Sequence, residues 1–338
     1  MVTARKNYPN TQVTPISCVY NKYKEADERE YIEYVHSQYQ GDFEYVYSDD
    51  KWMLRGFPEY SPLTDEPNVA QLMYSLTNSS YLRAAERDVR VVLTGYAGDQ
   101  VFGYNYYYIA DYLRKYKFMT FIKEANKLSR VLNEPLYSTA LEYGFKPLQR
   151  KGNRFEHSLM SEENYHKANE RYISKHFELM PGERSQFEFI DQAPQLYIFA
   201  RDYISEPLKM ESRHPFLDVD LVKFLYGIPL EIKTKNARSK GILIEAMKGV
   251  LPEKVLSRPG KSTTNALIFE GFKQEYHKLK RVIQQSILQE YGIVSTDLLM
   301  SNIEQLRQGN LRNIGKDFFP VLSLELWLQR KYKYSFAK

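Results

Sequence analysis

Short apolar runs alternate with longer amphipathic segments in the amino-terminal part of the chain. The runs at 13–20, 43–47 and 89–93 are rich in Val, Ile and Tyr and are closed by polar residues, which is typical of buried β-strands. Helical periodicity begins near Asp27 and again spans 69–85, after a connection rich in proline. The order β-α-β-α-β predicts a parallel sheet with helices on its faces, and ligands bind beyond the carboxyl ends of such strands.

From Tyr104 onward the pattern changes to helical periods, and no segment there predicts a strand. The helical periods cover 107–116, 119–132, 195–204, 219–226, 240–250, 269–290 and 321–334. We therefore expect two parts, an α/β part over residues 1–103 and a mainly helical remainder over residues 104–338.

Composition excludes several classes of protein. The chain has 338 residues, 43% of them hydrophobic and 26% charged, which is typical of a folded globular protein of about two domains. Cys18 is the single cysteine, so no intramolecular disulfide forms, and no Cys/His cluster has zinc spacing. The sequence has no membrane-spanning apolar stretch and no secretion signal at its start. These features predict a cytoplasmic protein without a membrane partner.

Charge gives little support to a nucleic-acid partner. The formal net charge is +5, from 47 basic and 42 acidic residues spread along the chain. The sequence contains no basic run and no RNA-binding motif. We therefore expect no nucleic-acid partner, although the small excess of basic over acidic residues could attract small anions.

A glycine-punctuated segment, TGYAGDQVFG at 94–103, follows the third expected strand directly. Glycines let backbone N–H groups approach an anion closely, and a carboxylate such as Asp99 can hold Mg²⁺ against phosphate oxygens. The segment also fits a plain β-α turn in which Asp99 caps the next helix. Both interpretations are open on these residues alone.

The segment at 94–103 resembles the second nucleotide motif of the asparagine synthetase family, whose usual form is Ser-Gly-Glu-Gly-x-Asp-Glu-x-Phe-Gly. Two later segments are similar to that family in the same order: ESRHPFLD at 211–218 and LPEKV at 251–255, which leads to Arg258 and Lys261. DER at 27–29 and DEP at 65–67 also resemble the group called asparagine synthase-related. Three ordered matches are far more specific than one.

This resemblance implies a doubly wound parallel sheet of the PP-loop type, followed by a mainly helical region. In such a domain Mg²⁺ and ATP serve to adenylate a carboxylate, and ammonia or another amine then displaces AMP to form an amide. Residues 1–103 would form a partial nucleotide-binding domain. By position, the implied site residues are Asp99 for the metal, Val19, Thr94, Gly95, Gly98 and Arg258 for the nucleotide, and Tyr96 and Lys261 for catalysis.

Structural interpretations compete for several of these residues. Lys261 could be a solvated loop lysine. GKS at 260–262 is also similar to the end of a Walker loop, but that loop's first glycine is replaced by Val255, so we reject this match. Asp218 could cap the helix expected over 219–226, and Arg213 could be structural or line the site.

The family's first motif, Ser-Gly-Gly-x-Asp-Ser, is absent from all 338 residues. Residues 4–10 resemble the tail of the helix that follows it, so we expect the chain to begin after that motif. The strand carrying the motif is central in such sheets, and its loss would open the sheet. We therefore expect this polypeptide alone to be poorly folded or inactive unless another chain supplies the strand.

Glutamine-using members of the family need an amino-terminal cysteine nucleophile. Residue 2 is Val, and Cys18 lies inside an expected strand. The resemblance therefore implies no glutaminase in these residues. Ammonia or another amine would come from elsewhere, including from a second chain.

Position 96 departs from the usual motif, because Tyr96 stands where asparagine synthetases have Glu. Tyrosine there is similar to the β-lactam synthetases, in which the phenol works with a glutamate as acid and base. Glu124, Glu134 and Glu142 are all candidates for that partner. Tyr96 could equally only line the pocket.

Three functions follow. The first is an ATP-dependent amide-forming ligase that resembles asparagine synthase. The second is a cyclase of the β-lactam synthetase or lasso-peptide type, which closes an amide within a peptide or β-amino acid. The third is an inactive fragment or scaffold. The carboxylate substrate distinguishes the first two functions, because the ligase would use free aspartate and the cyclase would use a peptide or β-amino acid.

Overall fold

The computed structural model describes residues 12–333, except 40–41, 58, 104–105, 149–157, 168–178, 235–236, 259, 261, 312–313 and 316. The side chains of 188–196 are also outside the described part. The expectations for residues 4–10 and for Lys261 therefore concern residues that the structure does not describe.

The described strands form two parallel pairs. In the first, β1 (Ile16–Val19) pairs with β2 (Glu44–Tyr47), and helix α2 (Arg29–Tyr39) connects them. In the second, β3 (Val91–Leu93) pairs with β4 (Glu211–Arg213). The expected strands and their parallel direction are confirmed. Instead of one continuous doubly wound sheet, however, the described residues form two sheets of two strands each.

Strand β4 corrects the expectation that no strand follows Tyr104. It has three residues, of which Glu211 and Arg213 are exposed and form an ion pair with each other at 2.8 Å. Only Ser212 is buried, and its hydroxyl donates to Tyr81 Oη at 3.1 Å. Such a segment has no hydrophobic run, and its strand conformation comes from pairing with β3 rather than from its own pattern.

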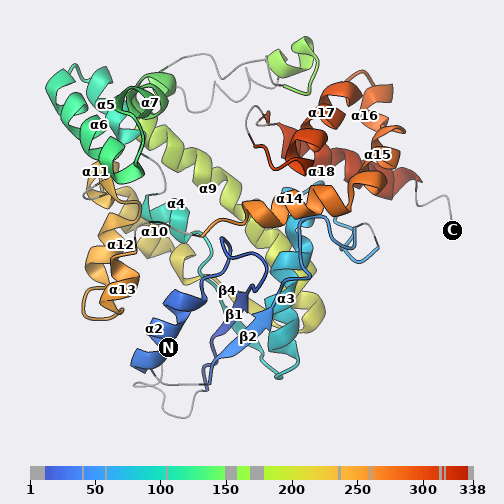
Figure 1. The fold of residues 1–338 in the computed structure, drawn as a ribbon, viewed down its shortest axis with the longest axis horizontal. Coiled ribbons are helices and arrows are strands. Elements are labelled where there is room, and N and C mark those ends of the chain that lie inside the picture. Colours follow the sequence, from blue (N-terminus) through green and yellow to red (C-terminus); the bar gives the residue numbers. More distant parts are fainter. Residues whose placement is uncertain are drawn as a thin grey trace.

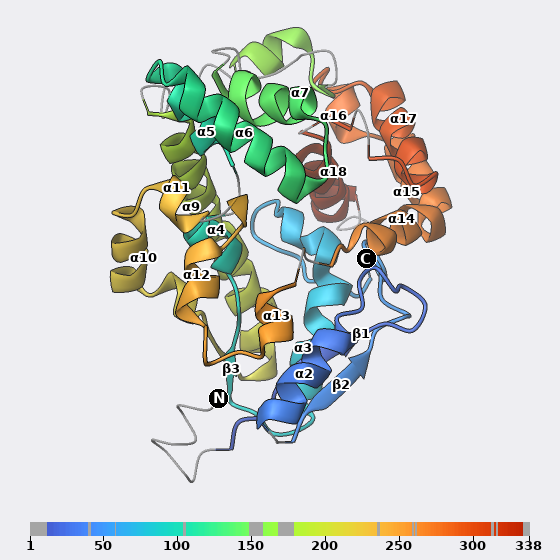
Figure 2. The same cartoon turned by 60° about the vertical axis from the view of Figure 1, so that its left-hand side comes forward.

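Helix α3 (Tyr74–Ala85), which follows the 3₁₀ turn η1 (Val69–Met73), packs against both sheets. Ile16 of β1 and Val92 of β3 lie against the same buried cluster, which includes Tyr81 and Ala84 of α3. Figure 2 shows α2 and α3 beside β1 and β2. The two strand pairs therefore share one helix layer, even though no backbone ladder joins them among the described residues.

Most of the remaining described chain is helical, as expected. Figure 1 shows α5–α7 at the upper left, α10–α13 below them and α14–α18 on the right. The elements are α4 (Gly98–Phe102), α5 (Tyr108–Arg114), α6 (Phe118–Leu132), α7 (Leu136–Thr139), η2 (Ala140–Phe145), η3 (Lys146–Leu148), α9 (Pro181–Ala200), η5 (Arg201–Ser205), η6 (Glu206–Leu208), η7 (Pro215–Leu217), α10 (Val219–Tyr226), α11 (Leu230–Lys233), α12 (Gly241–Ala246), α13 (Glu253–Leu256), α14 (Asn265–Gln274), α15 (Tyr276–Ile283), α16 (Ile287–Glu290), α17 (Thr296–Arg307), α18 (Phe318–Leu328) and η9 (Gln329–Lys333).

The helix expectations differ in accuracy. The helix expected over 219–226 is confirmed with both bounds, as α10. The long helix expected over 269–290 is wrong, because α14, α15 and α16 occupy that region. Ser286 explains the last break, since its hydroxyl accepts from Gln289 N–H and starts a new helix. No helix in the described part of the chain is long and apolar enough to cross a membrane.

A fully buried carboxylate holds the carboxy-terminal helices together. Glu325 of α18 is 0% exposed. Its oxygens accept hydrogen bonds from the Ser286 hydroxyl at 2.7 Å and from the N–H groups of Ile287 and Leu288 at 3.0 Å. Gln329 Nε2 donates to the same carboxylate at 2.7 Å. The charge faces the amino-terminal turn of α16, where it is favoured.

Replacing Glu325 by Gln should lower the free energy of unfolding by about 3 kcal/mol, because the new amide N–H₂ would face backbone donors. Urea-induced unfolding measures this loss. The matched control is Glu66→Gln at an exposed position, which should change stability by less than about 0.5 kcal/mol. Equal stability of the two variants would show that the buried carboxylate does not hold these helices.

Candidate functional site

A tight turn connects β3 to α4. Beyond β3, the Thr94 N–H donates to Arg213 C=O at 3.0 Å and so extends the pairing with β4 by one residue. The Gly98 N–H donates to Gly95 C=O at 3.2 Å, and Ala97, the residue before α4, has a positive φ of 66°. Asp99 thus lies in the first turn of α4, at the carboxyl end of a parallel strand, where ligands bind in such sheets.

Two glycines of this segment face different surroundings. A Cβ at Gly98 would lie 3.0 Å from the Phe216 ring, which follows β4, whereas a Cβ at Gly95 would meet nothing within 4 Å. Gly98 therefore permits a close contact between α4 and η7. Gly95 borders open space, as a residue beside a ligand would.

The Asp99 carboxylate pairs with a lysine that the sequence did not single out. Asp99 Oδ1 lies 2.7 Å from Lys240 Nζ, and each side chain is about one third exposed. Lys240 precedes α12 with φ of 58°, and its N–H donates to Gly103 C=O at 3.1 Å. The site thus carries a cation and an anion that solvent reaches. No spacing in the sequence connects residues so far apart, so only the tertiary structure reveals Lys240.

Thr94, Tyr96 and His214 form a second contact group at the same turn. Thr94 Oγ1 lies 2.6 Å from His214 Nδ1 and accepts a hydrogen bond from Tyr96 N–H at 3.3 Å. The rings of Tyr96 and Tyr197 meet the imidazole edge to face, with centroids at 5.4 and 5.1 Å. Among the described residues, the buried His214 Nε2 has no hydrogen-bond partner.

Burial changes the proton affinities of this group. It lowers the pKa of His214 below its ordinary value and raises the pKa of Tyr96 to about 12. At neutral pH the imidazole is therefore uncharged and the Tyr96 hydroxyl keeps its proton. A phenol in that state can donate a hydrogen bond to a developing negative charge.

The other expected site residues have contacts in different segments. Val19, at the end of β1, is 0% exposed and its C=O accepts from Ser48 N–H. Arg258 forms an ion pair with Glu28 at 2.8 Å, and its guanidinium lies 4.3 Å from the centre of the Tyr31 ring. Arg258 thus connects the segment after α13 to the α2 region.

The structural interpretation of Asp218 is confirmed. Its Oδ1 accepts from the N–H groups of Asp220 and Leu221 at 3.1 and 3.0 Å, which caps α10. Arg213 forms an exposed ion pair with Glu211 at 2.8 Å. The segment at 211–218 therefore contributes to the site through Phe216 and His214.

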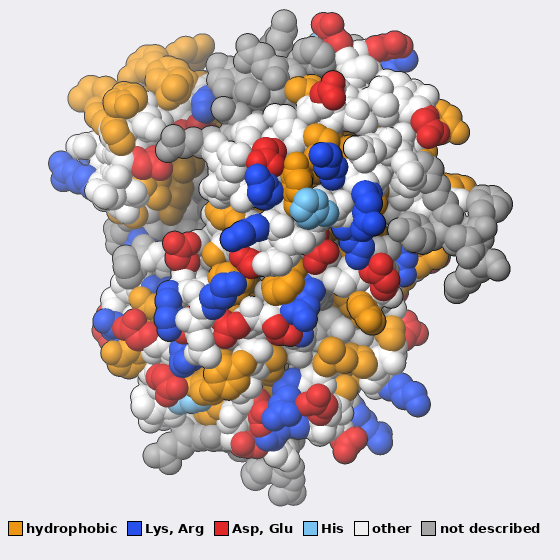
Figure 3. Space-filling model, turned by 45° about the vertical axis from the view of Figure 1, so that its right-hand side comes forward, with side chains coloured by type: hydrophobic (Ala, Val, Ile, Leu, Met, Phe, Trp, Pro, Cys, Tyr) orange, Lys and Arg blue, Asp and Glu red, His pale blue; other side chains and the backbone are white. Residues whose placement is uncertain are grey.

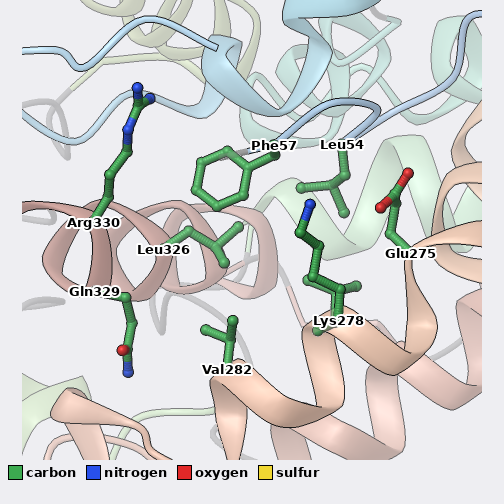
Figure 4. A pocket seen from close by; sticks show the side chains of 9 residues that line it. Leu54, Phe57, Glu275, Lys278, Val282, Leu326, Gln329 and Arg330 are labelled. Atoms are coloured by element: carbon green, nitrogen blue, oxygen red, sulfur yellow. The ribbon is translucent and has the colours of Figure 1, made fainter. Parts of the chain in front are cut away.

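A pocket in the carboxy-terminal helices lies apart from this turn. Figure 4 shows Leu54, Phe57, Val282 and Leu326 around it, with Lys278, Glu275 and Arg330 at its edge. The cavity volume that the centre of a water molecule can occupy is about 10 Å³, so the cavity holds at most a single water molecule. It is too small for a nucleotide or an amino acid.

Metal binding would depend on few ligands from the protein. The described residues contain no group of three or more His, Cys, Asp or Glu side chains that could hold a metal ion. Mg²⁺ fits such a site, because it is commonly held by one or two carboxylates together with substrate phosphates and water. Asp99 supplies one such carboxylate.

Comparison with known proteins gives the family. The family model for asparagine synthase matches residues 1–329, which is nearly the whole chain. The chain belongs to the asparagine synthase family. Asparagine synthetase [glutamine-hydrolyzing] 1 of Bacillus subtilis (strain 168) is 26% identical over 263 residues, 72% of this chain and 41% of that relative. Asparagine synthetase [glutamine-hydrolyzing] 3 of the same organism is 41% identical over 58 residues, 17% of this chain and 9% of that relative.

Membership of the asparagine synthase family supports an ATP-dependent amide-forming ligase in general terms. Matched segments of this chain cover less than half the length of either relative. The names of those relatives include glutamine hydrolysis, and these names describe the complete proteins, of which this chain matches only a part.

Gly98→Ala should lower the free energy of unfolding by about 1–3 kcal/mol, because the new Cβ overlaps the Phe216 ring. Gly95→Ala is the matched control and should have almost no effect on stability. Adding Phe216→Leu to Gly98→Ala should recover part of the loss, which a double-mutant cycle from urea unfolding measures. Additive effects in the cycle would contradict the contact.

Proposed function

We propose that this chain contains the synthetase part of an enzyme that joins a carboxylic acid to an amine at the expense of ATP. The observation that carries the proposal is Asp99 beside Lys240 at the carboxyl end of β3. One group attracts a divalent cation and the other a phosphate, so Mg²⁺ with pyrophosphate oxygens can replace their mutual ion pair.

The proposed reaction has two steps, adenylation of the carboxylate and attack by the amine. A carboxylate oxygen of the substrate attacks the α-phosphorus of ATP, and the bond to the bridging oxygen breaks to release pyrophosphate. The amine nitrogen then attacks the acyl carbon, loses a proton and expels AMP with the electron pair of the acyl-oxygen bond. Negative charge develops on phosphate oxygens in the first step and on the acyl oxygen in the second.

Residues in and beside the turn at 94–99 can stabilise these developing negative charges. Lys240 lies where it can neutralise charge on a phosphate, and Mg²⁺ on Asp99 would add to this stabilisation. The Gly95 backbone borders open space and can approach a phosphate, while Thr94 is held by His214. By resemblance, Lys261 would neutralise charge at the reacting centre, Val19 would lie near adenine, and Gly98 and Arg258 would contact the nucleotide.

The two strand pairs fit halves of one doubly wound sheet. We assign the order β2-β1-x-β3-β4, where x is a strand that carries the family's Ser-Gly-Gly-x-Asp-Ser motif. That motif is absent from these 338 residues, so a segment or chain outside them would supply it. Val91 is 40% and Leu93 is 60% exposed on one face of β3, whereas parallel sheets are normally covered on both faces, so the segment that supplies strand x would also supply a covering layer there.

Tyr96 favours a second candidate, the intramolecular cyclase. Its phenol lies at the same turn, and with its pKa raised to about 12 it would serve that reaction as the proton or hydrogen-bond donor, so the base would be the glutamate that works with it. Of the candidate partner glutamates, Glu124 pairs with Lys127 and Glu142 pairs with Lys146. These contacts do not assign the partner of Tyr96.

Asp99→Asn should strongly reduce carboxylate-dependent ATP–pyrophosphate exchange in the enzyme that contains this chain. A loss of about 10²–10³-fold is expected, because a fixed charge that stabilises the reacting phosphate is removed. Lys240→Gln should lower exchange as well. Lys248→Gln is the matched control, because Lys248 is exposed and forms its ion pair with Glu245, three residues before it in the chain. Full exchange in Asp99→Asn would exclude Asp99 from the site.

Tyr96→Phe distinguishes the ligase from the cyclase. If Tyr96 serves the second step, the variant should keep ATP–pyrophosphate exchange and lose about 10²–10⁴-fold in amide formation. The assay compares aspartate plus ammonia with a peptide substrate, and mass spectrometry identifies the product. Unchanged amide formation would make Tyr96 a lining residue. Absence of exchange with every carboxylate in the wild type would support the scaffold instead.

A further inference from the structure

Four large apolar side chains protrude together where α5 meets α6. Tyr116 is 81%, Phe118 55%, Met119 80% and Ile122 52% exposed. We call these four residues the apolar tip. Figure 1 places α5 and α6 at a corner of the molecule, and Figure 3, turned by 45° from that view, shows a broad hydrophobic area at its upper left.

The core of the protein does not account for these side chains. Helix α6 packs inward through Phe121, Ala125 and Leu128, which belong to a buried cluster with α5. Helical spacing puts Met119 and Ile122 outside this buried face, whereas Phe118 lies on the same side as Phe121 but is 55% exposed at the first residue of the helix. Farther along the face of Met119 and Ile122 the residues become polar, namely Asn126 and Arg130. The apolar character is therefore confined to the amino-terminal end of α6.

The backbone holds the tip in place. Tyr116 has a positive φ of 58°, an uncommon conformation for a bulky residue. Its N–H donates to Leu113 C=O at 3.0 Å, and the next N–H, of Lys117, donates to Tyr112 C=O at 2.8 Å. The Tyr116 and Phe118 rings meet edge to face at 6.4 Å. The turn thus presents its aromatic rings without a partner segment to order them.

Basic side chains surround the tip. Arg114, Lys115, Lys117 and Lys123 are all exposed. Among the described residues, no ion pair joins Lys115, Lys117 or Lys123 to a carboxylate. The acidic residue of the same helix, Glu124, pairs with Lys127 at 3.6 Å. The surface around the apolar tip is consequently positive.

We propose that the apolar tip binds the surface of an anionic lipid bilayer. The aromatic and aliphatic side chains enter the boundary between headgroups and acyl chains, while the lysines contact anionic headgroups. A helix with apolar residues on one face and lysines beside them is typical of such interfacial binding. No spanning helix is needed, so the lack of one among the described residues is compatible with this proposal.

Other occupants fit the charges less well. In a two-fold dimer through the tip, the basic surface around the tip of one copy would face the same basic surface of the other copy, and like charges repel. Protein interfaces are enriched in Tyr, Phe and Met but depleted in Lys. An anionic lipid surface matches both the apolar and the basic residues. This proposal is independent of the proposed ligase and departs from the expectation of no membrane partner, which rested on spanning-length runs.

Vesicle sedimentation of the full-length protein tests the proposal. Binding should be stronger to phosphatidylcholine vesicles that contain phosphatidylserine than to phosphatidylcholine alone, and should weaken as salt rises. Met119→Ser should reduce partitioning roughly tenfold through lost apolar burial, and Lys117→Gln about fivefold. The matched controls are Phe224→Ser, at an exposed position of α10, and Lys248→Gln, and both should bind like the wild type.

Tryptophan fluorescence measures insertion of the apolar tip into the bilayer. A Phe118→Trp variant should show a blue shift of tryptophan emission when anionic vesicles are added. The proposal is overturned if the protein does not bind these vesicles, or if the tip and control variants bind equally. It is also overturned if Phe118→Trp emission stays unchanged, because the tip then does not enter the bilayer. Circular dichroism shows whether each variant is folded.

Discussion

The parallel pairing of β3 with β4 is the constraint on which the candidate site depends. These strands are three residues long each, and they join segments that lie more than a hundred positions apart in the sequence. Their register, extended by Thr94 N–H to Arg213 C=O, places His214 against Thr94 and Phe216 beneath Gly98. Without that pairing, the turn that holds Asp99 would have no fixed partner.

Helices that pack on α4 complete the site. Val101 and Phe102 of α4 are buried against Leu225 of α10, and Ile242 of α12 packs on the same cluster. Lys240 precedes α12, so this packing brings its ammonium to Asp99. The carboxylate therefore comes from a strand-to-helix turn and the cation from the helical layer. One core fixes the distance between them.

Sequence patterns identified the local structure well. The strands at β1, β2 and β3, helix α10 and its Asp218 cap could all be predicted, because each is encoded by residues near one another in the chain. The loop with Asp99 was recognised for the same reason, since glycines and a carboxylate follow directly on a strand. The resemblance to the family is carried by such short ordered segments, and the family model confirms it over residues 1–329.

Sequence patterns do not predict the features that depend on contacts between distant segments. Strand β4 has charged residues at both ends and is a strand only because β3 lies beside it. Lys240 belongs to the site through packing between distant segments, and no spacing signals it. His214 lies in the family-like segment at 211–218, but only the pairing of β3 with β4 places it against Thr94. The break between α15 and α16 depends on the buried Glu325, which accepts the amino-terminal N–H groups of α16. Each of these contacts joins segments that are distant in the chain, so no single stretch of sequence predicts it.

The central claim is that the turn at 94–99 binds the phosphates of ATP with Mg²⁺. Hydrogen exchange measured by mass spectrometry, on the enzyme that contains this chain, tests it most directly. With Mg²⁺ and a non-hydrolysable ATP analogue, we expect slower exchange of the amides at 95–99 and at 240–241, and no change in α17. Equal exchange with and without the nucleotide at 95–99 would contradict the account.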